Sequence, residues 1–125
     1  MAIHVGVDLA AVRDVEDALS RHGERYLRRI YTDAEILDCQ TPRGMDPRRL
    51  ASLFAAKEAT IKVLSADTGL SMRDIAVCSD ATGRARLKLG GTAADLAHAA
   101  GLTELVLGLT RSGDYAAAVV LAESE

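Results

Sequence analysis

One segment near the middle of the chain places charged side chains where they could bind a metal ion and a phosphate. Lys57, Glu58 and Lys62 stand among Ala, Phe, Ile and Leu in a stretch whose pattern is typical of a helix. Glu58 and Lys62 are four residues apart, so they share one helix face. An unpaired charge among apolar side chains is costly, so charges kept there usually have a function. A carboxylate one turn from an ammonium group can bind a metal with one group and a phosphate with the other.

A second carboxylate, Asp8, is expected close to Glu58 in the fold. Alternating apolar residues predict a strand over residues 3–9, with Asp8 near its C-terminal end on the face opposite the apolar set. If the helix that carries Glu58 packs on this strand, the two carboxylates approach each other. Two carboxylates completed by water and phosphate oxygens suit Mg²⁺, a hard cation that keeps several waters. We therefore predict a magnesium site at Asp8 and Glu58, with Lys62 facing the phosphates.

A turn near the C-terminus offers further partners for a phosphate. Arg111, Ser112 and Gly113 supply a guanidinium, a hydroxyl and a flexible backbone. The metal-binding residues also have a plainer interpretation. Glu58 and Lys62 would form only a surface ion pair, worth about 0.3–0.5 kcal/mol, and Asp8 would only cap a strand end. Residue types and spacing alone leave both interpretations open.

The elements that would position these groups predict an α+β fold. Thr32 to Glu35 forms a capping box, and Asp46 followed by Pro47 starts the long helix. Thr92 is expected to cap a short Ala-rich helix. The expected elements, in chain order, are a strand at 3–9, helices at 14–30, 33–39 and 46–64, strands at 75–77 and 87–89, a helix at 92–100, and strands at 105–109 and 115–121. The order β-α-α-α-β-β-α-β-β favours mostly antiparallel strands rather than a doubly wound sheet.

Length and composition describe one soluble domain. The chain has 125 residues, which suits a single domain over residues 1–125. Its net charge is −3, so general nucleic-acid binding, which favours a basic domain, is not expected. No apolar run approaches the roughly 20 residues that span a bilayer, and the N-terminus lacks the pattern of a secretion signal. We therefore expect a cytoplasmic protein with no membrane contact, in which Cys39 and Cys78 are buried free thiols.

Two arginine-rich segments, residues 21–29 and 43–49, stand out against the acidic balance of the chain. Their positive charge could bind an acidic protein partner or a phosphorylated ligand. A solvated helix face with local ion pairs is the alternative.

Four motifs, in this order along the chain, resemble those of one known family. They are GVDL at residues 6–9, RRIYTDAE at residues 28–35, FAAKEA at residues 54–59 and DYAAAVV at residues 114–120. Together they extend over essentially the whole chain and resemble the holo-acyl-carrier-protein synthases, the small trimeric class of 4′-phosphopantetheinyl transferases. The motif FAAKEA, with a lysine four residues after its glutamate, is quite specific for this family. GVD near the N-terminus confirms how the chain lines up with the family's motifs.

The resemblance implies an α+β fold of the 4′-phosphopantetheinyl transferase type and a group-transfer reaction. The family moves the phosphopantetheine arm of coenzyme A onto a serine of an apo acyl carrier protein and releases adenosine 3′,5′-bisphosphate. By this resemblance Asp8 and Glu58 would hold Mg²⁺ against the pyrophosphate, and Lys62 would pair with a phosphate. The metal would neutralise charge on the leaving phosphate, and Glu58 or a metal-bound water would take the serine proton.

The resemblance also implies further contacts and partners. The family builds its site between neighbouring subunits, so a homotrimer is expected. The basic first helix would dock the acidic helix of the carrier protein. The residues expected to bind coenzyme A are Lys62, Gly83, Thr110, Arg111 and Ser112, and those expected to dock the carrier protein are Arg13, Arg21 and Arg25.

The chain departs from the family's usual residues around the coenzyme A site. The differing residues are Leu53, Ser65, Asp67, Ala85, Arg111 and, in the first helix, Asp14. Arg111 could bind a phosphate in place of the usual histidine, and it stays charged. Leu53 cannot replace the usual arginine, at a loss of about 1.5–3 kcal/mol for a charge-assisted bond. An active transferase is therefore the first interpretation, and a non-catalytic homologue that binds carrier proteins or an assembly-line partner is the alternative.

Overall fold

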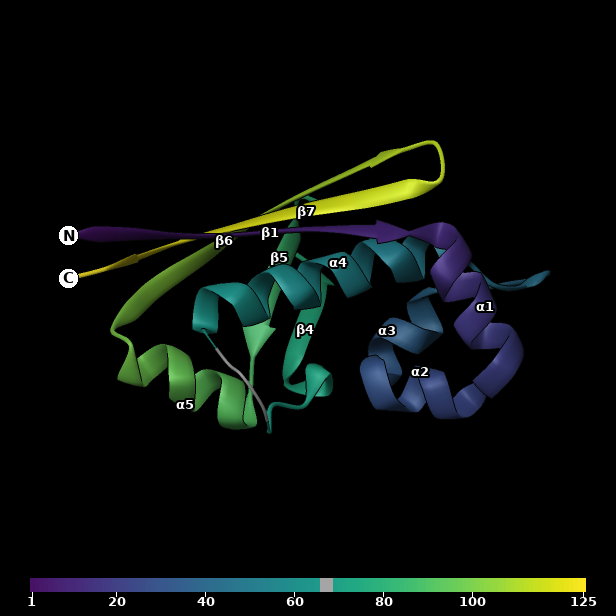
Figure 1. Cartoon of the computed structure of the whole chain (residues 1–125), viewed down its shortest axis with the longest axis horizontal. Helices are drawn as coiled ribbons and strands as arrows, with labels where there is room; N and C mark the ends of the chain where they lie inside the picture. The colour runs from purple at the N-terminus through teal and green to yellow at the C-terminus, as the bar shows by residue number, and fades with distance from the viewer. Residues whose placement is uncertain (66–68) are drawn as a thin grey trace.

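The sheet that carries one candidate carboxylate lies directly on the helix that carries the other. In the computed structural model, which describes residues 1–65 and 69–125, strands β1 (Ala2–Ala11), β7 (Tyr115–Ser124) and β6 (Leu102–Ser112) form an antiparallel sheet in the order β1-β7-β6. The long helix α4 (Pro47–Leu64) runs along one face of this sheet (Figure 1). None of the described elements covers the sheet's other face (Figure 1).

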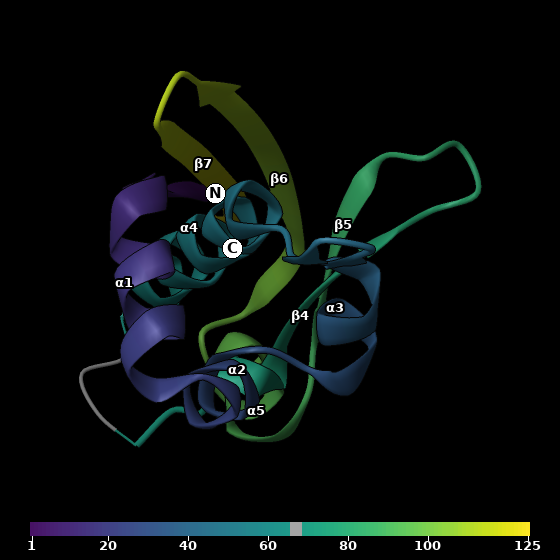
Figure 2. The same cartoon turned by 90° about the vertical axis from the view of Figure 1, so that its right-hand side faces the viewer.

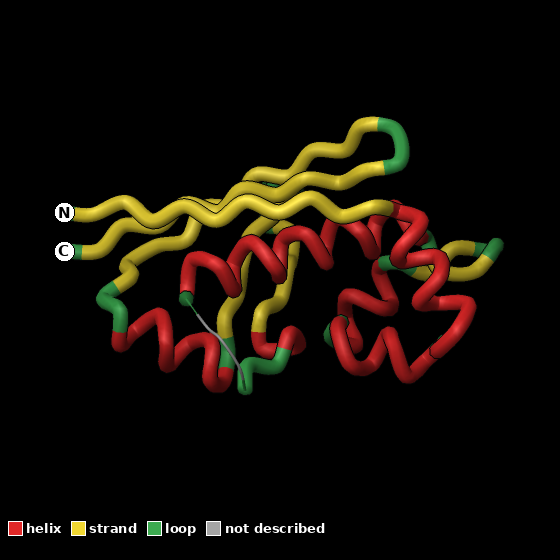
Figure 3. Tube along the Cα trace, viewed as in Figure 1, coloured by secondary structure: helices red, strands yellow, loops and turns green. Residues whose placement is uncertain are grey.

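The remaining elements pack on the far side of α4 or project from it. They are α1 (Val12–His22), α2 (Glu24–Ile30), α3 (Asp33–Asp38), β2 (Gln40–Thr41), β3 (Gly44–Met45), the short 3₁₀ turn η1 (Met72–Asp74), β4 (Ile75–Ser79), β5 (Ala85–Leu89) and α5 (Gly91–Ala99). The hairpin of β4 and β5 extends away from the helices (Figure 2). The α+β class with antiparallel strands is confirmed (Figure 3), and the described chain has one helix and one small hairpin more than expected. In the described part of the chain, no helix combines the length and apolar character needed to cross a membrane.

The helix expected over residues 14–30 is two helices, α1 and α2, so that prediction was wrong. Gly23 between them has φ 51°, a left-handed conformation that glycine adopts without steric cost. Its N–H donates to the carbonyl oxygen of Leu19 at 2.9 Å and ends α1. The apolar spacing continues across this break, which is why the pattern did not reveal it.

Two of the three predicted helix caps are present. In the capping box, the Thr32 hydroxyl accepts from the N–H of Glu35 at 3.1 Å, and the Glu35 carboxylate accepts from the N–H of Thr32 at 2.8 Å. Asp46 caps α4 and accepts from two N–H groups of its first turn. Thr92 does not cap α5, because that helix starts one residue earlier and Gly90 is its N-cap.

Ser65, one of the departures from the usual residues, lies at the C-terminal end of α4. Ser65 has φ 54° and ψ 37°, a left-handed conformation that favours glycine. Serine at this position therefore carries backbone strain that glycine would not. Asp67, in the same connector, lies outside the described residues.

Small side chains let the sheet lie very close to α4. The small buried residues of β1, β7 and α4 are Gly6, Ala10, Ala116, Ala118, Ala122, Ala51, Ala55, Ala56 and Ala59. At Gly6 an added Cβ would lie 2.0 Å from the carbonyl oxygen of Ala59 and 3.0 Å from Cγ2 of Val63. Only glycine fits there, because the obstacle is helix backbone, which no rotamer change can remove.

The apolar side chains of β1 point away from α4, toward the uncovered face of the sheet. Ile3, Val5, Val7 and Leu9 are 62%, 56%, 57% and 64% exposed. Asp8 lies on the opposite face, as predicted. The close approach of α4 decides which face is buried, since only the small-residue face can be accommodated.

The two cysteines differ, although both were expected to be buried. Cys39 has no exposed surface, and burial raises the pKa of its thiol to about 11. Cys78 is exposed on β4, so the prediction was wrong for this residue. Both are free thiols, as predicted.

At pH 8, iodoacetamide should modify Cys78 in the native protein and leave Cys39 intact, because the buried thiol is both inaccessible and protonated. Peptide mass spectrometry after a short labelling pulse would measure the two sites separately. Denatured protein is the control and should be modified at both. Equal labelling of the two cysteines in the native protein would contradict this expectation.

Candidate active site

Asp8, Glu58 and Lys62 form a cluster between β1 and α4, which we call the carboxylate–lysine cluster. The Nζ of Lys62 donates to Oδ1 of Asp8 at 3.0 Å and to the carbonyl oxygen of Val7 at 2.7 Å. The Asp8 side chain is 17% exposed and that of Lys62 is 52% exposed. The surface ion pair considered between Glu58 and Lys62 is not among the ion pairs of the described residues, because Lys62 pairs with Asp8.

The charges of Asp8 and Lys62 both affect the pKa of the Glu58 carboxyl group. Burial raises the pKa of its carboxyl group, the nearby Asp8 charge raises it further, and Lys62 opposes the shift. Lys62, one helical turn from Glu58, contacts Asp8, and the Asp8 charge acts on Glu58, so the structure places the two carboxylates near each other, as expected from packing α4 on β1. In the described residues, no third His, Cys, Asp or Glu joins them to complete a ready-made metal cage. The donor set is two carboxylates, one of them paired with the Lys62 ammonium group, and two carboxylates suit a hard cation that keeps water.

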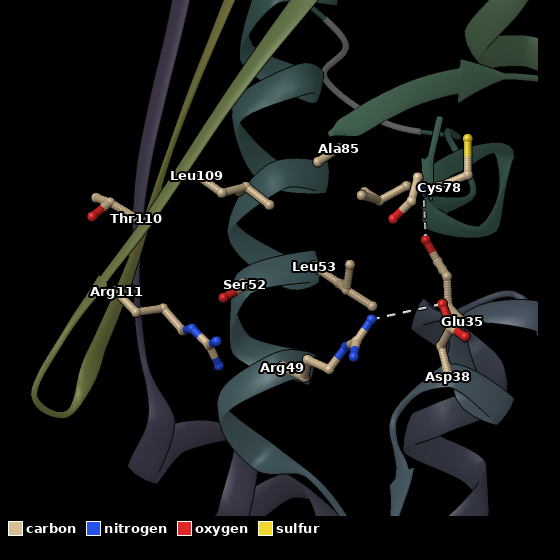
Figure 4. A pocket seen from close by; sticks show the side chains of 12 residues that line it. Glu35, Asp38, Arg49, Ser52, Leu53, Cys78, Ala85, Leu109, Thr110 and Arg111 are labelled. Atoms are coloured by element: carbon tan, nitrogen blue, oxygen red, sulfur yellow. Dashed lines mark hydrogen bonds and ion pairs between the residues drawn. The ribbon is translucent and has the colours of Figure 1, made fainter. Parts of the chain in front are cut away.

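A pocket of about 270 Å³ lies on another side of α4, which we call the α4–β6 pocket (Figure 4). The residues that line it are Glu35, Asp38, Arg49, Ser52, Leu53, Val77, Cys78, Ser79, Ala85, Leu109, Thr110 and Arg111. They come from α3, α4, the β4–β5 hairpin and the end of β6. Of the residues predicted to bind coenzyme A, Thr110 and Arg111 are in this lining.

Two arginines, Arg49 and Arg111, line the α4–β6 pocket beside two acidic residues, Glu35 and Asp38. Arg111 extends from β6 toward α4 (Figure 4). Arg49 extends from α4 toward α3, where its guanidinium lies 3.8 Å from the Asp38 carboxylate, an exposed and weak contact (Figure 4). Leu53, the residue that cannot replace an arginine, stands one helical turn from Arg49 on the same side of α4. Arg49 thus offers a guanidinium close to the place where one was expected to be missing.

The carboxylate–lysine cluster and the α4–β6 pocket face different directions. Leu53 and Lys62 are nine residues apart on α4, which at about 100° per residue places them on opposite sides of the helix. Asp8 lies on β1 and Thr110 on β6, the two edge strands of the sheet. Within one chain the two groups of predicted residues therefore do not meet.

The other predicted residues lie at the surface. Gly83, with φ 84°, is exposed in the β4–β5 turn, and Ser112 is exposed at the end of β6. Neither lines the α4–β6 pocket. Arg13 and Arg21 are exposed on α1, and Arg25 on α2 lines a shallow surface groove.

Sequence reasoning did not assign Arg49 to the site. It placed this residue only in a basic segment, although the four-residue spacing from Leu53 was visible in the sequence. The charged wall around Arg49 and Arg111 becomes apparent only when β6 and the β4–β5 hairpin are placed beside α4.

Comparison with known proteins identifies the family of the chain. Residues 4–120 match the 4′-phosphopantetheinyl transferase superfamily. A holo-[acyl-carrier-protein] synthase of Paramagnetospirillum magneticum is 41% identical over 130 residues, covering 100% of this chain and 98% of the relative. That of Halorhodospira halophila is 39% identical, covering 97% of each chain. The structure of the Chronobacterium ammoniagenes ACPS–CoA complex has a TM-score of 0.85 at 33% identity, covering 100% of this chain and 99% of the other.

The chain therefore belongs to the 4′-phosphopantetheinyl transferase superfamily. Its relatives over nearly the whole length are holo-[acyl-carrier-protein] synthases, so the enzyme class predicted from the four motifs is confirmed, as is the fold.

Proposed function

We propose that this enzyme, with Mg²⁺, transfers the 4′-phosphopantetheine group of coenzyme A to a serine of an apo acyl carrier protein and releases adenosine 3′,5′-bisphosphate. The observation that carries the proposal is the meeting of Asp8, Glu58 and Lys62 between β1 and α4. The related Chronobacterium ammoniagenes protein in complex with CoA supports coenzyme A as the donor. The name of the relatives supports an acyl carrier protein as the acceptor.

Asp8 and Glu58 are the residues that would hold the magnesium ion. Two carboxylates leave the other coordination positions to water and phosphate oxygens, which is how Mg²⁺ is usually bound beside a substrate phosphate. When bound, the ion supplies positive charge beside the pyrophosphate. Burial and the Asp8 charge raise the pKa of Glu58, and a cation would relieve the repulsion between the two carboxylates.

Lys62 and Glu58 have separate roles in the transfer. Lys62 is half exposed, so its ammonium group can turn from Asp8 to a phosphate oxygen and hold the pyrophosphate in place. The serine oxygen attacks the phosphorus that carries the pantetheine arm, and the bond from this phosphorus to the bridging oxygen breaks. Glu58 accepts the serine proton, since burial and the Asp8 charge raise the pKa of its carboxyl group and so make the carboxylate a stronger base.

The α4–β6 pocket would receive another part of coenzyme A. Arg111 and Arg49 supply the guanidinium groups that phosphates prefer, so Arg49 offsets the arginine that Leu53 replaces. Leu53 and Thr110 then provide an apolar wall and a hydroxyl beside the same ligand. Gly83, Thr110, Arg111 and Ser112 stay predicted contacts of coenzyme A, together with Lys62.

A homotrimer would bring the two halves of this site together. The carboxylate–lysine cluster lies at the β1 edge of the sheet and the α4–β6 pocket at the β6 edge. A ring in which the β1 edge of one subunit meets the β6 edge of the next would join them, and heterologous contacts of this kind close into rings. The uncovered sheet face, with Val5 56% and Leu121 42% exposed, supplies the apolar surface for such contacts.

Leu121→Asp should disrupt the trimer, because a charge at the centre of the uncovered sheet face would be buried without a partner. Light scattering after size-exclusion chromatography should give about three times the 13.2 kDa chain mass for the wild type and a smaller species for the variant. We expect the transfer activity of the Leu121→Asp protein to fall by about tenfold or more as the trimer is lost. Leu37→Asp, an equally drastic change at a 70% exposed leucine of α3, is the control and should keep the trimer. A wild-type protein that stays monomeric at assay concentration would contradict the proposal.

The carrier protein would dock on the basic surface of α1 and α2. Arg13, Arg21 and Arg25 are exposed there, and Arg25 shares its groove with His22 and Arg29. Positive charge on an otherwise acidic protein steers an acidic partner toward this face.

The experiment that tests the proposed function is incubation with an apo acyl carrier protein, coenzyme A and Mg²⁺, followed by mass spectrometry of the carrier. The expected result is a phosphopantetheine adduct on one serine that requires both coenzyme A and Mg²⁺. No adduct on several carriers at high enzyme concentration would overturn the proposal. Binding of a carrier without transfer would favour a non-catalytic homologue instead.

A further inference from the structure

The long helix carries a buried lysine that the proposed reaction does not use. Lys57 has no exposed surface, and its Nζ lies 2.8 Å from Oε1 of Glu35, which is 2% exposed. The same Nζ donates to the carbonyl oxygens of Met72, at 3.0 Å, and Ile75. All three ammonium protons thus have acceptors. The residue faces away from the sheet, toward α3, η1 and β4.

Glu35 connects this lysine to two further backbone groups. Its Oε1 closes the capping box on the N–H of Thr32, and its Oε2 accepts from the N–H of Val77 at 2.8 Å. The ion pair of Lys57 and Glu35 therefore joins four elements: α4, α3, η1 and β4. Buried ion pairs of this kind are often no more stabilising than apolar side chains of the same size, so their retention points to a specific arrangement rather than to stability.

The arrangement that depends on this pair is one wall of the α4–β6 pocket. Glu35 and Val77 both line that pocket, opposite Leu53 and Arg49 of α4. The β4–β5 hairpin is a two-stranded sheet that projects from the body (Figure 2), and such a hairpin does not hold its position alone. The bond from Glu35 to the N–H of Val77 ties its base to α3, and Lys57 ties the same base to α4.

We propose that Lys57 and Glu35 are positioning residues that hold the β4–β5 wall of the α4–β6 pocket against α4 and thereby set the affinity for coenzyme A. The inference rests on the proposed function, because it assigns coenzyme A to this pocket. Neither residue touches the reacting atoms. Replacing them should weaken the binding of coenzyme A more than it slows the chemical step.

A matched pair of variants at Val77 tests this link with the ion pair left in place. Val77→Pro removes the N–H that donates to Glu35, and Val77→Ala trims the side chain but keeps that N–H. Because this N–H points to Glu35 and not to β5, proline is compatible with the strand. Titration calorimetry with coenzyme A and Mg²⁺ should show at least about tenfold weaker binding for Val77→Pro than for Val77→Ala. In the transfer assay, the KM for coenzyme A should rise more than kcat falls.

A second variant separates positioning from stability. Lys57→Met combined with Glu35→Met replaces the pair by apolar side chains. It also leaves four backbone groups without these partners, the N–H groups of Thr32 and Val77 and the carbonyls of Met72 and Ile75, so the protein is expected to be less stable and binding is measured well below its melting temperature. Weakened coenzyme A binding in this folded protein would support the inference, since a merely structural pair would leave the affinity unchanged. Wild-type affinity in both Val77→Pro and the double variant would overturn it. Failure of the wild type itself to bind coenzyme A would count against the proposed function, which keeps the two outcomes distinct.

Discussion

Glu58→Gln should lower phosphopantetheine transfer by about a thousandfold or more and leave the fold intact. The change removes one of the two carboxylates of the carboxylate–lysine cluster, and a neutral amide oxygen is a poor substitute for an anionic metal ligand. It also removes the only side chain we assign to accept the serine proton. Losing both functions corresponds to several kcal/mol of transition-state stabilisation.

The stability of the Glu58→Gln protein should not fall with its activity. Burial and the Asp8 charge raise the pKa of Glu58 in the folded protein, so its ionised form is disfavoured by folding. For a carboxyl whose folded pKa is raised, the unfavourable contribution is present above that pKa and disappears as the group is protonated at lower pH. At neutral pH a neutral glutamine therefore removes an unfavourable contribution, and the melting temperature should stay the same or rise.

Mass spectrometry of the carrier protein measures the transfer rate, and thermal unfolding measures stability. Asp95→Asn, a neutralised carboxylate exposed on α5, is the matched control and should keep both activity and melting temperature. A Glu58→Gln protein that transfers at the wild-type rate would remove Glu58 from the mechanism. A protein that loses activity and melts at a much lower temperature would show instead that Glu58 supports the fold.

Gly6→Ala should destabilise the protein by about 3 kcal/mol or more, because the added methyl group meets helix backbone. Its carbon would lie 2.0 Å from the carbonyl oxygen of Ala59 and 3.0 Å from the side chain of Val63. Neither strand nor helix can relieve this contact by a rotamer change, so β1 and α4 must separate. For a chain of this size the melting temperature should fall by about 10 °C or more.

The same separation should weaken the active site. Asp8 lies two residues from Gly6 on the same face of β1, while Glu58 and Lys62 directly precede the two residues that the new methyl group would meet. Moving β1 away from α4 therefore moves the two carboxylates apart. We expect activity measured well below the new melting temperature to be reduced at least about tenfold.

Gly108→Ala on β6 provides the matched control in the same sheet. The Cβ added at Gly108 would lie 3.1 Å from a side-chain methyl of Val119, and this methyl can shift by a few tenths of an ångström. The cost should stay within about 1 kcal/mol. If the Gly6→Ala protein had the same melting temperature as the wild type, β1 and α4 would be less closely packed than a backbone contact at Gly6 requires.

Local signals in the sequence were accurate where a few neighbouring residues decide the outcome. The capping box of Thr32 and Glu35 and the N-cap Asp46 were predicted correctly, because each depends on hydrogen bonds within one helical turn. The break at Gly23 was missed, because an apolar pattern reports which side chains lie on one face and not the backbone angle of a single glycine. Thr92 was assigned as a cap although the helix starts one residue before it.

Contacts between distant segments could not be predicted in the same way. The alternation of β1 identified the strand, but the close approach of α4 decides that Gly6 and Ala10 are buried while Val5 and Val7 are exposed. Lys57 and Lys62 looked alike as charges in an apolar helix. One forms a fully buried ion pair with Glu35, and the other forms a half-exposed pair with Asp8.

By itself the sequence determined the family and the α+β class, and it predicted Asp8 and Glu58 as the two metal-binding carboxylates, because these depend on residue types at set spacings. The tertiary structure decided that Asp8 pairs with Lys62 and that Arg49 joins Arg111 in a pocket on the other side of α4. It also separated the two halves of the site within one chain. The physical reason is that these relations depend on how closely strands and helix pack, and that distance is determined by side-chain volume across an interface rather than by any pattern along the chain.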